Sequence, residues 1–194
     1  MSFASPPSPA AFTSMVNYYQ GTLYGFLYGL VGNGEQARDL TQDAFHDAWL
    51  ATKRSAPPFA ALRGPSEDIR RWLFQVAYHR AISLLRRRRL IRFESLEEHD
   101  EDEQGIPGSG SFEALLAERE ALHHALRQLT PPDVACLLLR VVQGFSAAEA
   151  AEILETTPDN VNKRLSRAKQ RLRAAYLAQE EQPQHLQPRK GRSQ

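Results

Sequence analysis

Basic residues gather in two stretches of the chain and could bind a polyanion. Residues 63–92 hold nine arginines against two acidic residues, and residues 161–173 hold six lysines and arginines with no acidic residue. Between them, residues 93–110 hold seven acidic residues and no lysine or arginine. The formal net charge of +1 hides this alternation. We interpret the pattern as two polyanion-binding surfaces separated by a segment that repels polyanions.

The second basic stretch belongs to a pair of predicted helices joined by a tight turn. Ser146 and Glu149 form a capping box for the first helix, and Thr157 followed by Pro158 caps the second. This spacing is typical of a helix-turn-helix, whose second helix enters the major groove of duplex DNA. Six side chains on that helix suit base edges and phosphates, with the last two expected on its exposed side: Thr157, Asn160, Asn162, Lys163, Arg164 and Arg167. The alternative is a solvated basic face on an ordinary helical hairpin.

Apolar residues recur at three- and four-residue steps through the rest of the chain, which predicts helices and no strand. Beyond the helix-turn-helix, helices are expected at residues 12–31, 35–50, 66–89, 111–128 and 130–144, with a loop at 51–65. The prediction is an all-α protein of two small helical domains joined by a flexible acidic linker, the C-terminal domain containing the helix-turn-helix. The expected segments are residues 10–92, the linker at 93–110, residues 111–178 and a disordered tail at 179–194.

Several classes of protein are disfavoured by the residues. We find no phosphate-binding glycine loop, no Ser-His-Asp arrangement and no paired catalytic carboxylates, which predicts no enzymatic activity, no cofactor and no small-molecule substrate. His123 and His124 are adjacent and point to different helix faces, so no metal site is expected. The single cysteine, Cys136, favours a reducing cytoplasm and a buried apolar role.

The first 34 residues carry no charged side chain, yet membrane insertion is not expected. The longest apolar run, at residues 23–30, is far shorter than the roughly 18 residues needed to span a bilayer. Gly21, Gly25 and Gly29 are spaced four residues apart, and we interpret this stripe as close helix packing within a helical bundle.

The residues in both halves resemble one known family. Residues 129–140, 144–154 and 161–173 closely resemble the C-terminal promoter-binding domain of extracytoplasmic-function sigma factors. Residues 37–49 and 71–77, with the arginines at 86–89, independently resemble the family's N-terminal domain. The resemblance implies core RNA polymerase and promoter DNA as partners, with an anti-sigma factor as a further candidate partner.

The resemblance assigns the second predicted helix to docking on the large catalytic subunit of RNA polymerase. The residues that it places there are Asp39, Leu40, Gln42, Asp43, Phe45 and His46. Four of them, Asp39, Gln42, Asp43 and His46, follow the spacing of one polar helix face, which suits a partner bearing arginines. On spacing alone, a solvated acidic face is the simpler interpretation.

The third predicted helix and the loop before it would, by the same resemblance, open the minus-ten element and hold one DNA strand. Aromatic rings beside arginines suit exposed bases and backbone phosphates. The resemblance places six residues there: Arg71, Tyr78, His79, Arg80, Arg86 and Arg87. Trp72 lies on the apolar stripe instead and is expected in the core.

The helix-turn-helix would, by the same resemblance, read the minus-thirty-five element. Its turn carries Glu155 where the family usually has glycine.

Two other functions remain as alternatives. A free-standing helix-turn-helix regulator would bind an operator as a dimer, and tight binding of the purified protein alone to duplex DNA would favour it. A sigma factor binds DNA weakly until polymerase aligns both domains. A small helical enzyme would need a pocket with perturbed titratable groups, and the sequence presents no coherent set.

The acidic linker generates a first prediction. Its seven carboxylates are expected to oppose DNA binding by the free protein, by repelling phosphates or by covering arginines near 86–89 and 164–173. Replacing all seven with amides should therefore tighten non-specific DNA binding at low salt, with the difference fading near 0.15 M salt, where the Debye length is about 8 Å. The residues to change are Glu94, Glu97, Glu98, Asp100, Glu101, Asp102 and Glu103. Equal binding of mutant and parent in a low-salt titration would show that the linker is only a spacer.

Overall fold

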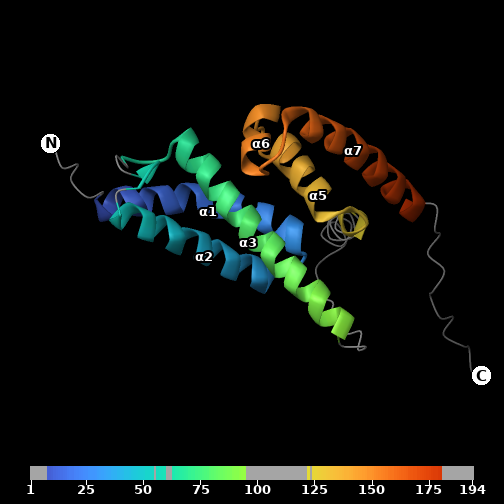
Figure 1. The fold of residues 1–194 in the computed structure, drawn as a ribbon, viewed down its shortest axis with the longest axis horizontal. Coiled ribbons are helices and arrows are strands. Elements are labelled where there is room, and N and C mark those ends of the chain that lie inside the picture. The colour runs from blue at the N-terminus through green and yellow to red at the C-terminus, as the bar shows by residue number, and fades with distance from the viewer. Residues whose placement is uncertain (1–7, 55, 60–62, 95–121, 123, 181–194) are drawn as a thin grey trace, which may run out of the picture.

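The computed structural model describes residues 8–54, 56–59, 63–94, 122 and 124–180, and within these ranges it contains helices and no strand (Figure 1). The all-α prediction is therefore confirmed for the described residues. Most of the predicted acidic linker, most of the helix expected at 111–128 and most of the predicted C-terminal tail lie outside them. The described helices run two residues further than predicted at both boundaries, to Glu94 before the linker and to Glu180 at the start of the tail. The described elements are α1 (Pro9–Val31), α2 (Gly34–Lys53), α3 (Glu67–Glu94), α5 (Pro131–Leu137), the π-helix η2 (Leu138–Val142), α6 (Ala147–Ile153) and α7 (Pro158–Glu180).

The N-terminal half is a bundle of α1, α2 and α3 whose helix ends follow local signals. Gly32 ends α1 in the left-handed conformation, with φ of 72°, which glycine adopts without steric cost. Asn33 then caps α2 by accepting a hydrogen bond from the Gln36 amide at 2.9 Å. The Ser66 hydroxyl caps α3 by accepting from the Ile69 amide at 3.3 Å. These local caps set where the three helices reverse direction.

The C-terminal half contains the predicted helix-turn-helix as α6 and α7. The capping box is confirmed: the Ser146 hydroxyl accepts from the Glu149 amide at 3.1 Å, and the Glu149 carboxylate accepts from the Ser146 amide at 2.8 Å. Thr157 caps α7 by accepting from the Asn160 amide at 3.2 Å, as predicted. The turn between these helices, with its two caps, fixes α7 relative to α6.

The helix expected at 130–144 changes its winding before it ends. After α5 it becomes the π-helix η2, in which the Gln143 amide donates to the Leu138 carbonyl at 2.9 Å. Gly144 follows with φ of 73°, and the Phe145 amide returns to the Leu139 carbonyl at 3.0 Å. This ending turns the Phe145 side chain into the core, where it is 1% exposed.

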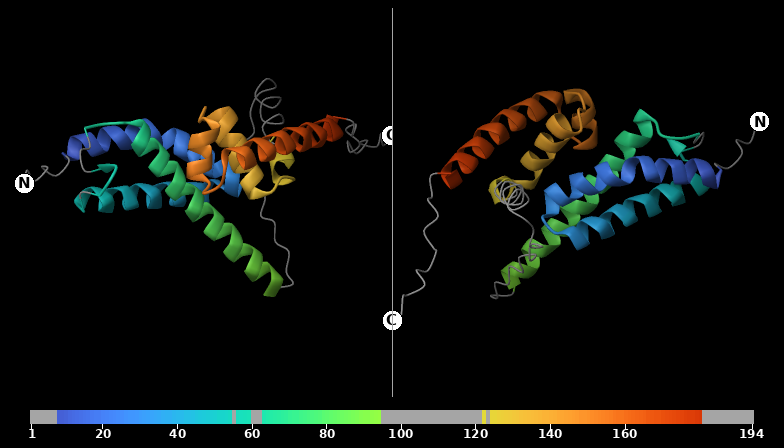
Figure 2. Two further views of the ribbon diagram at one scale, coloured as in Figure 1. Left: turned by 45° about the horizontal axis from the view of Figure 1, so that its top comes forward. Right: turned by 180° about the vertical axis from the view of Figure 1, so that it is seen from behind.

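The two halves pack against each other, which the sequence did not predict. α6 lies against α3, and α5 and η2 lie against α1, so that one apolar core includes residues of both halves. The Phe145 ring lies 5.2 Å from the Phe74 ring of α3, between centroids, and the Arg70 guanidinium lies 4.0 Å from the Phe145 ring. Figure 2 shows α6 beside the first part of α3, whereas the C-terminal ends of α3 and α7 project away from this contact.

Of the three glycines spaced four residues apart on α1, only Gly29 lies at the contact between α1 and η2. A Cβ at Gly29 would come within 2.7 Å of Leu138 Cδ1, so the absence of a side chain lets η2 approach α1. Gly21 and Gly25 are exposed, with nothing within 4 Å of such an added Cβ, so close packing is the wrong interpretation for these two. None of the described helices is long and apolar enough to span a membrane.

The difference between the glycines is testable. Gly25→Ala should raise the free energy of unfolding by about 0.5–1 kcal/mol, because alanine loses less backbone entropy in a helix and its Cβ meets nothing. Gly29→Ala should give a smaller gain or a loss, because Leu138 must move. Urea unfolding of both variants measures this, and an equal gain at the two positions would show that Leu138 does not constrain Gly29.

Candidate nucleic-acid and polymerase interfaces

The polar face expected on α2 is present and exposed to solvent. Asp39, Gln42, Asp43 and His46 are all exposed. Leu40 and Phe45 were also expected to contact a partner, but both are only 8% exposed and belong to the apolar core. These two residues therefore hold α2 onto the bundle, and a docking role for them stays a prediction. The α2 face is defined here as Asp39, Gln42, Asp43 and His46.

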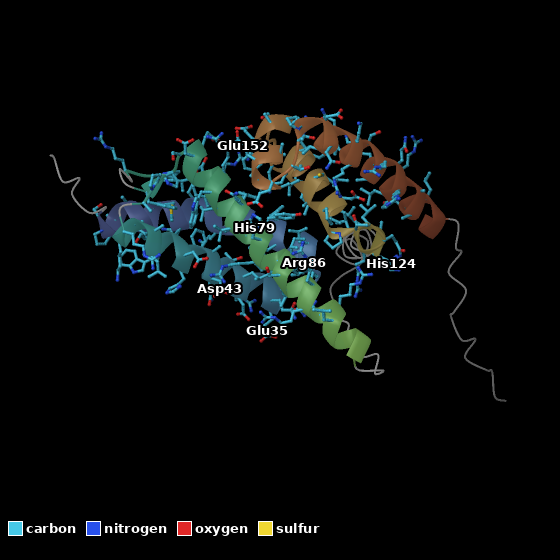
Figure 3. The ribbon with its side chains drawn as sticks, in the orientation of Figure 1. Glu35, Asp43, His79, Arg86, His124 and Glu152 are labelled. Atoms are coloured by element: carbon cyan, nitrogen blue, oxygen red, sulfur yellow. The ribbon has the colours of Figure 1, made fainter. Side chains whose placement is uncertain are left out.

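Arg80 of α3 connects that face to the strand-binding candidates. Its Nε donates to Asp47 Oδ2 at 2.8 Å, and its Nη1 donates to Asp43 Oδ2 at 3.0 Å. Asp43 and Arg80 are thus partners across α2 and α3 (Asp43 is labelled in Figure 3). Arg80 was expected to bind DNA, and the structure shows it neutralised by two carboxylates of its own domain.

The remaining strand-binding candidates on α3 fall into two groups. Arg86 and Arg87 are exposed on the half of α3 that leads away from α6 (Arg86 is labelled in Figure 3). Arg71 is bound by Asp68 on its own helix and by Glu152 of α6, whose Oε2 lies 3.1 Å from Arg71 Nη1. His79 Nε2 lies 3.1 Å from Glu155 Oε1, in the turn after α6. The C-terminal half thus contacts Arg71 and His79, whose side chains remain 33% and 44% exposed.

Tyr78 is also turned toward the C-terminal half. Burial is the main cause that raises the pKa of its phenol, and Cys136 of α5 raises it further, while Arg164 and Arg86 act in the opposite direction. Cys136 is fully buried, as predicted, and burial raises the pKa of its thiol to about 11. A thiol that stays protonated is a poor nucleophile, which fits the packing role.

The loop before α3 is anchored to the helix by aromatic contact. Phe59 is fully buried, and its ring meets the Trp72 ring edge-on at 4.8 Å between centroids. Trp72 is partly buried and packs against the core, in agreement with the prediction. Residues 60–62 of this loop lie outside the described residues.

The predicted reading helix α7 exposes only part of its candidate set. Four of the candidates are exposed: Thr157, Asn162, Lys163 and Arg167. Lys163 pairs with Asp159 one turn earlier at 2.7 Å. The Asn160 amide donates to Thr156 Oγ1 at 2.7 Å, so its side chain is engaged with the turn. An amide already bound there has fewer free donors for a base edge.

Arg164 is only partly exposed, with 31% of its side chain accessible, because it is paired with α5, and this corrects the prediction. Its Nη1 lies 3.3 Å from Asp133 Oδ1, and the Asp133 side chain is 7% exposed. Arg171 is a second, longer partner at 3.6 Å from Asp133 Oδ2. A buried carboxylate needs such partners, so Arg164 ties α7 to the first turn of α5.

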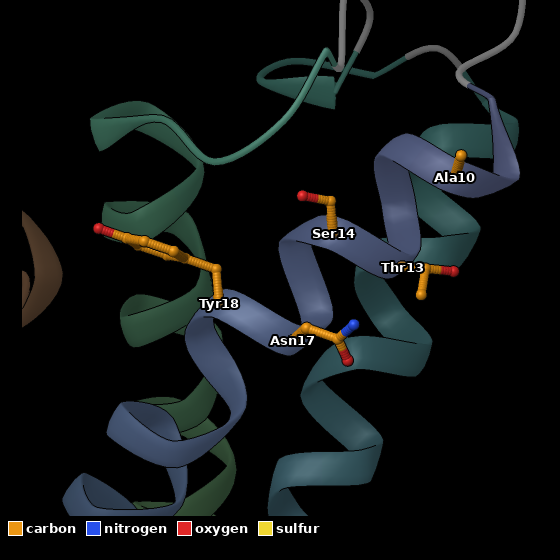
Figure 4. Close-up of a pocket in the computed structure, with 5 residues that line it drawn as sticks. All are labelled: Ala10, Thr13, Ser14, Asn17 and Tyr18. Carbon is orange, nitrogen blue, oxygen red and sulfur yellow. The ribbon is translucent and has the colours of Figure 1, made fainter.

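A hollow of about 660 Å³ runs along the outer face of α1 (Figure 4) and is lined by Ala10, Thr13, Ser14, Asn17 and Tyr18. No carboxylate, imidazole, thiol or amine lines it. No group of His, Cys, Asp or Glu in the described part of the chain could hold a metal ion.

Two family matches cover most of the described chain, and their order defines a sigma factor. Residues 15–91 match Sigma-70 region 2, and residues 119–172 match Sigma-70, region 4. The chain belongs to the extracytoplasmic-function family of bacterial RNA polymerase sigma factors. Proteins of this class are non-enzymatic transcription initiation factors.

Relatives and solved structures agree with that assignment. The chain is 30% identical to RNA polymerase sigma factor YlaC of Bacillus subtilis over 164 residues, covering 80% of this chain and 86% of the relative. It is 28% identical to ECF RNA polymerase sigma factor SigX of the same organism over 158 residues, covering 77% and 75%. The fold resembles RpoE in its complex with the anti-sigma factor NepR from Bartonella quintana, with a TM-score of 0.65, 23% identity and coverage of 84% and 95%. It also resembles CnrH in complex with the cytosolic domain of CnrY, with a TM-score of 0.60, 22% identity and coverage of 92% and 94%.

Sequence reasoning missed the residues that join the two halves. Glu152 and Glu155 are three residues apart, and Arg71, Gln75 and His79 are four residues apart on one face of α3. The complementary spacing is visible in the sequence, but it indicates a contact only once α3 is known to face α6 and the turn after it.

The corrected position of Arg164 generates a prediction. Arg164→Ala should lower the free energy of unfolding by about 2 kcal/mol, because it removes the nearer partner of the buried Asp133 carboxylate. Arg167→Ala is the matched control and should change stability by less than about 0.5 kcal/mol, because Arg167 is exposed. Thermal or urea unfolding measures both, and equal effects would contradict a structural role for Arg164.

Proposed function

We propose that this sigma factor, which directs RNA polymerase to promoters, docks on the core enzyme through the α2 face. The single observation that carries this assignment is the exposure of that face above a buried Leu40 and Phe45. Carboxylates that stay accessible on a rigid helix offer fixed acceptors to arginines of a partner. The proposal places the protein beside RNA polymerase, in the bacterial cytoplasm.

Each half then takes a different form of DNA. We assign the single strand of the minus-ten element to α3 and the loop before it, where exposed Arg86 and Arg87 meet phosphates and Tyr78 and His79 meet bases once they are uncovered. We assign the duplex at the minus-thirty-five element to α7, with Asn162 toward base edges and Lys163 and Arg167 toward phosphates.

An inhibitory protein partner is also part of the proposal. The solved structures of RpoE and CnrH that resemble this fold are complexes with NepR and with CnrY, the first of which is described as an anti-sigma factor. The likeness supports the same kind of partner for this chain. A free-standing helix-turn-helix regulator is not favoured, because the N-terminal half matches Sigma-70 region 2.

Run-off transcription tests the function directly. The purified protein is added to core polymerase and genomic promoter fragments from the native bacterium, and specific transcripts are expected only when both protein and core are present. A protein that binds duplex DNA tightly alone and yields no transcript with core would instead be a regulator.

The docking surface is tested by charge reversal. Asp39→Arg should lower affinity for core polymerase about tenfold or more, because a positive charge would face the arginines of the partner. Asp43 is left unchanged, since it also holds Arg80. Glu67→Arg on α3 is the matched control, with the same charge change at an exposed residue outside the α2 face. Affinity is measured by titrating labelled protein with core, and an equal affinity of both variants would remove the assignment to α2.

A further inference from the structure

Asp159 is an acidic residue on α7, the helix that the proposed function assigns to duplex DNA. Residues 158–179 of the chain hold six lysines and arginines, and Asp159 is their only acidic residue. The side chain of Asp159 is 75% exposed. A carboxylate turned toward a polyanion weakens binding through repulsion, unless it gains a hydrogen-bond donor on the DNA. Its presence on this helix therefore calls for such a donor.

The position of Asp159 is at the end of α7 that is suited to reading bases. It is the second residue of the helix, directly after Pro158. Five exposed residues follow one another on this face at three- and four-residue steps: Asp159, Asn162, Lys163, Ser166 and Arg167. In a helix-turn-helix, the N-terminal residues of the reading helix contact base edges. Asp159 therefore lies beside Asn162 where bases are read.

The neighbours of Asp159 leave its carboxylate available to DNA. Lys163 Nζ lies 2.7 Å from Asp159 Oδ2, and the Lys163 side chain is 69% exposed. An exposed ion pair of this kind is weak, so it opens at little cost. The nearby ammonium group also offsets part of the charge that the carboxylate brings toward the phosphates. Asn160, in contrast, is already bound to Thr156.

A carboxylate only accepts hydrogen bonds, and this restricts the bases that it can bind. In the major groove, the donors are the amino groups at N4 of cytosine and N6 of adenine, whereas guanine and thymine present acceptors. Adenine also presents its N7 acceptor beside the donor, where it would face the second carboxylate oxygen. Cytosine itself presents no acceptor at this edge. Asp159 therefore matches cytosine best and repels guanine and thymine.

We propose that Asp159 selects cytosine at one position of the minus-thirty-five element, by accepting a hydrogen bond from the N4 amino group. This rests on the proposed function of α7. The competing role is structural, because an acidic residue in the first turn of a helix, with a lysine four residues later, stabilises that helix. A structural role would affect binding to every sequence equally. A reading role depends on the base.

The test uses holoenzyme assembled from the full chain and core polymerase, and a promoter fragment that the parent transcribes. Each base pair of the minus-thirty-five element is changed in turn to the other three. With the parent, one position should favour cytosine over guanine or thymine by about fivefold or more in affinity. Asp159→Ala should remove this preference, by weakening binding to cytosine and strengthening binding to guanine and thymine.

A second variant covers the case in which Asp159→Ala folds poorly. Asp159→Asn keeps the shape of the side chain and adds a donor, so the preferred base at that position should change from cytosine to adenine, which an amide binds through N6 and N7. Glu35→Ala is the matched control, because Glu35 is the exposed second residue of α2. It should change no base preference.

The base dependence decides between the two roles. An equal loss of affinity for all four bases in both Asp159 variants would overturn the proposal and leave a helix-stabilising residue. A parent preference that both variants retain would overturn it as well. Transcription by the parent is scored separately, so an Asp159-independent preference leaves the sigma-factor function standing, and absence of any specific transcript removes both.

Discussion

Phe74 lies between aromatic rings from both halves of the chain, and the arrangement of the molecule depends on this position. Its ring centroid is 5.1 Å from Phe26 of α1 and 5.2 Å from Phe145, which precedes α6. The side chain is fully buried. A buried aromatic residue contributes roughly 150–250 Å² of contact, more than any single charged pair at the rim. One helix, α3, therefore closes the N-terminal bundle on one side and receives the C-terminal half on the other.

Much of the local structure could be predicted because its signals are local. A cap such as Asn33, Ser66 or Thr157 needs only an amide two or three residues ahead, and this partner is visible in the sequence. The capping box at Ser146 and the ending of α1 at Gly32 follow the same logic. The all-α fold and the helix-turn-helix could be predicted for this reason.

The errors concern partners that are distant in the chain. Arg164 was placed on the exposed side because its spacing along α7 allowed it, but the position of Asp133 in α5 draws it inward. Gly21 and Gly25 share the spacing of Gly29, yet only Gly29 meets Leu138, because η2 crosses α1 at that turn alone. Leu40 and Phe45, which the resemblance assigned to docking, are only 8% exposed because they pack in the core. The spacing of residues along a helix predicts which of them share a face. It does not predict which other element packs against that face.

Arg80 gives the N-terminal half a means of reciprocal coupling. Arg80 binds Asp43 of the α2 face, and it is also one of the α3 residues predicted to bind the DNA strand. If polymerase docks on the α2 face as proposed, an arginine that takes Asp43 would leave Arg80 held by Asp47 alone, and so more available to a phosphate. By thermodynamic linkage, a phosphate that takes Arg80 must free Asp43 for the enzyme to the same degree. Under the proposed roles of α2 and α3, docking and strand capture would then strengthen each other through one guanidinium group.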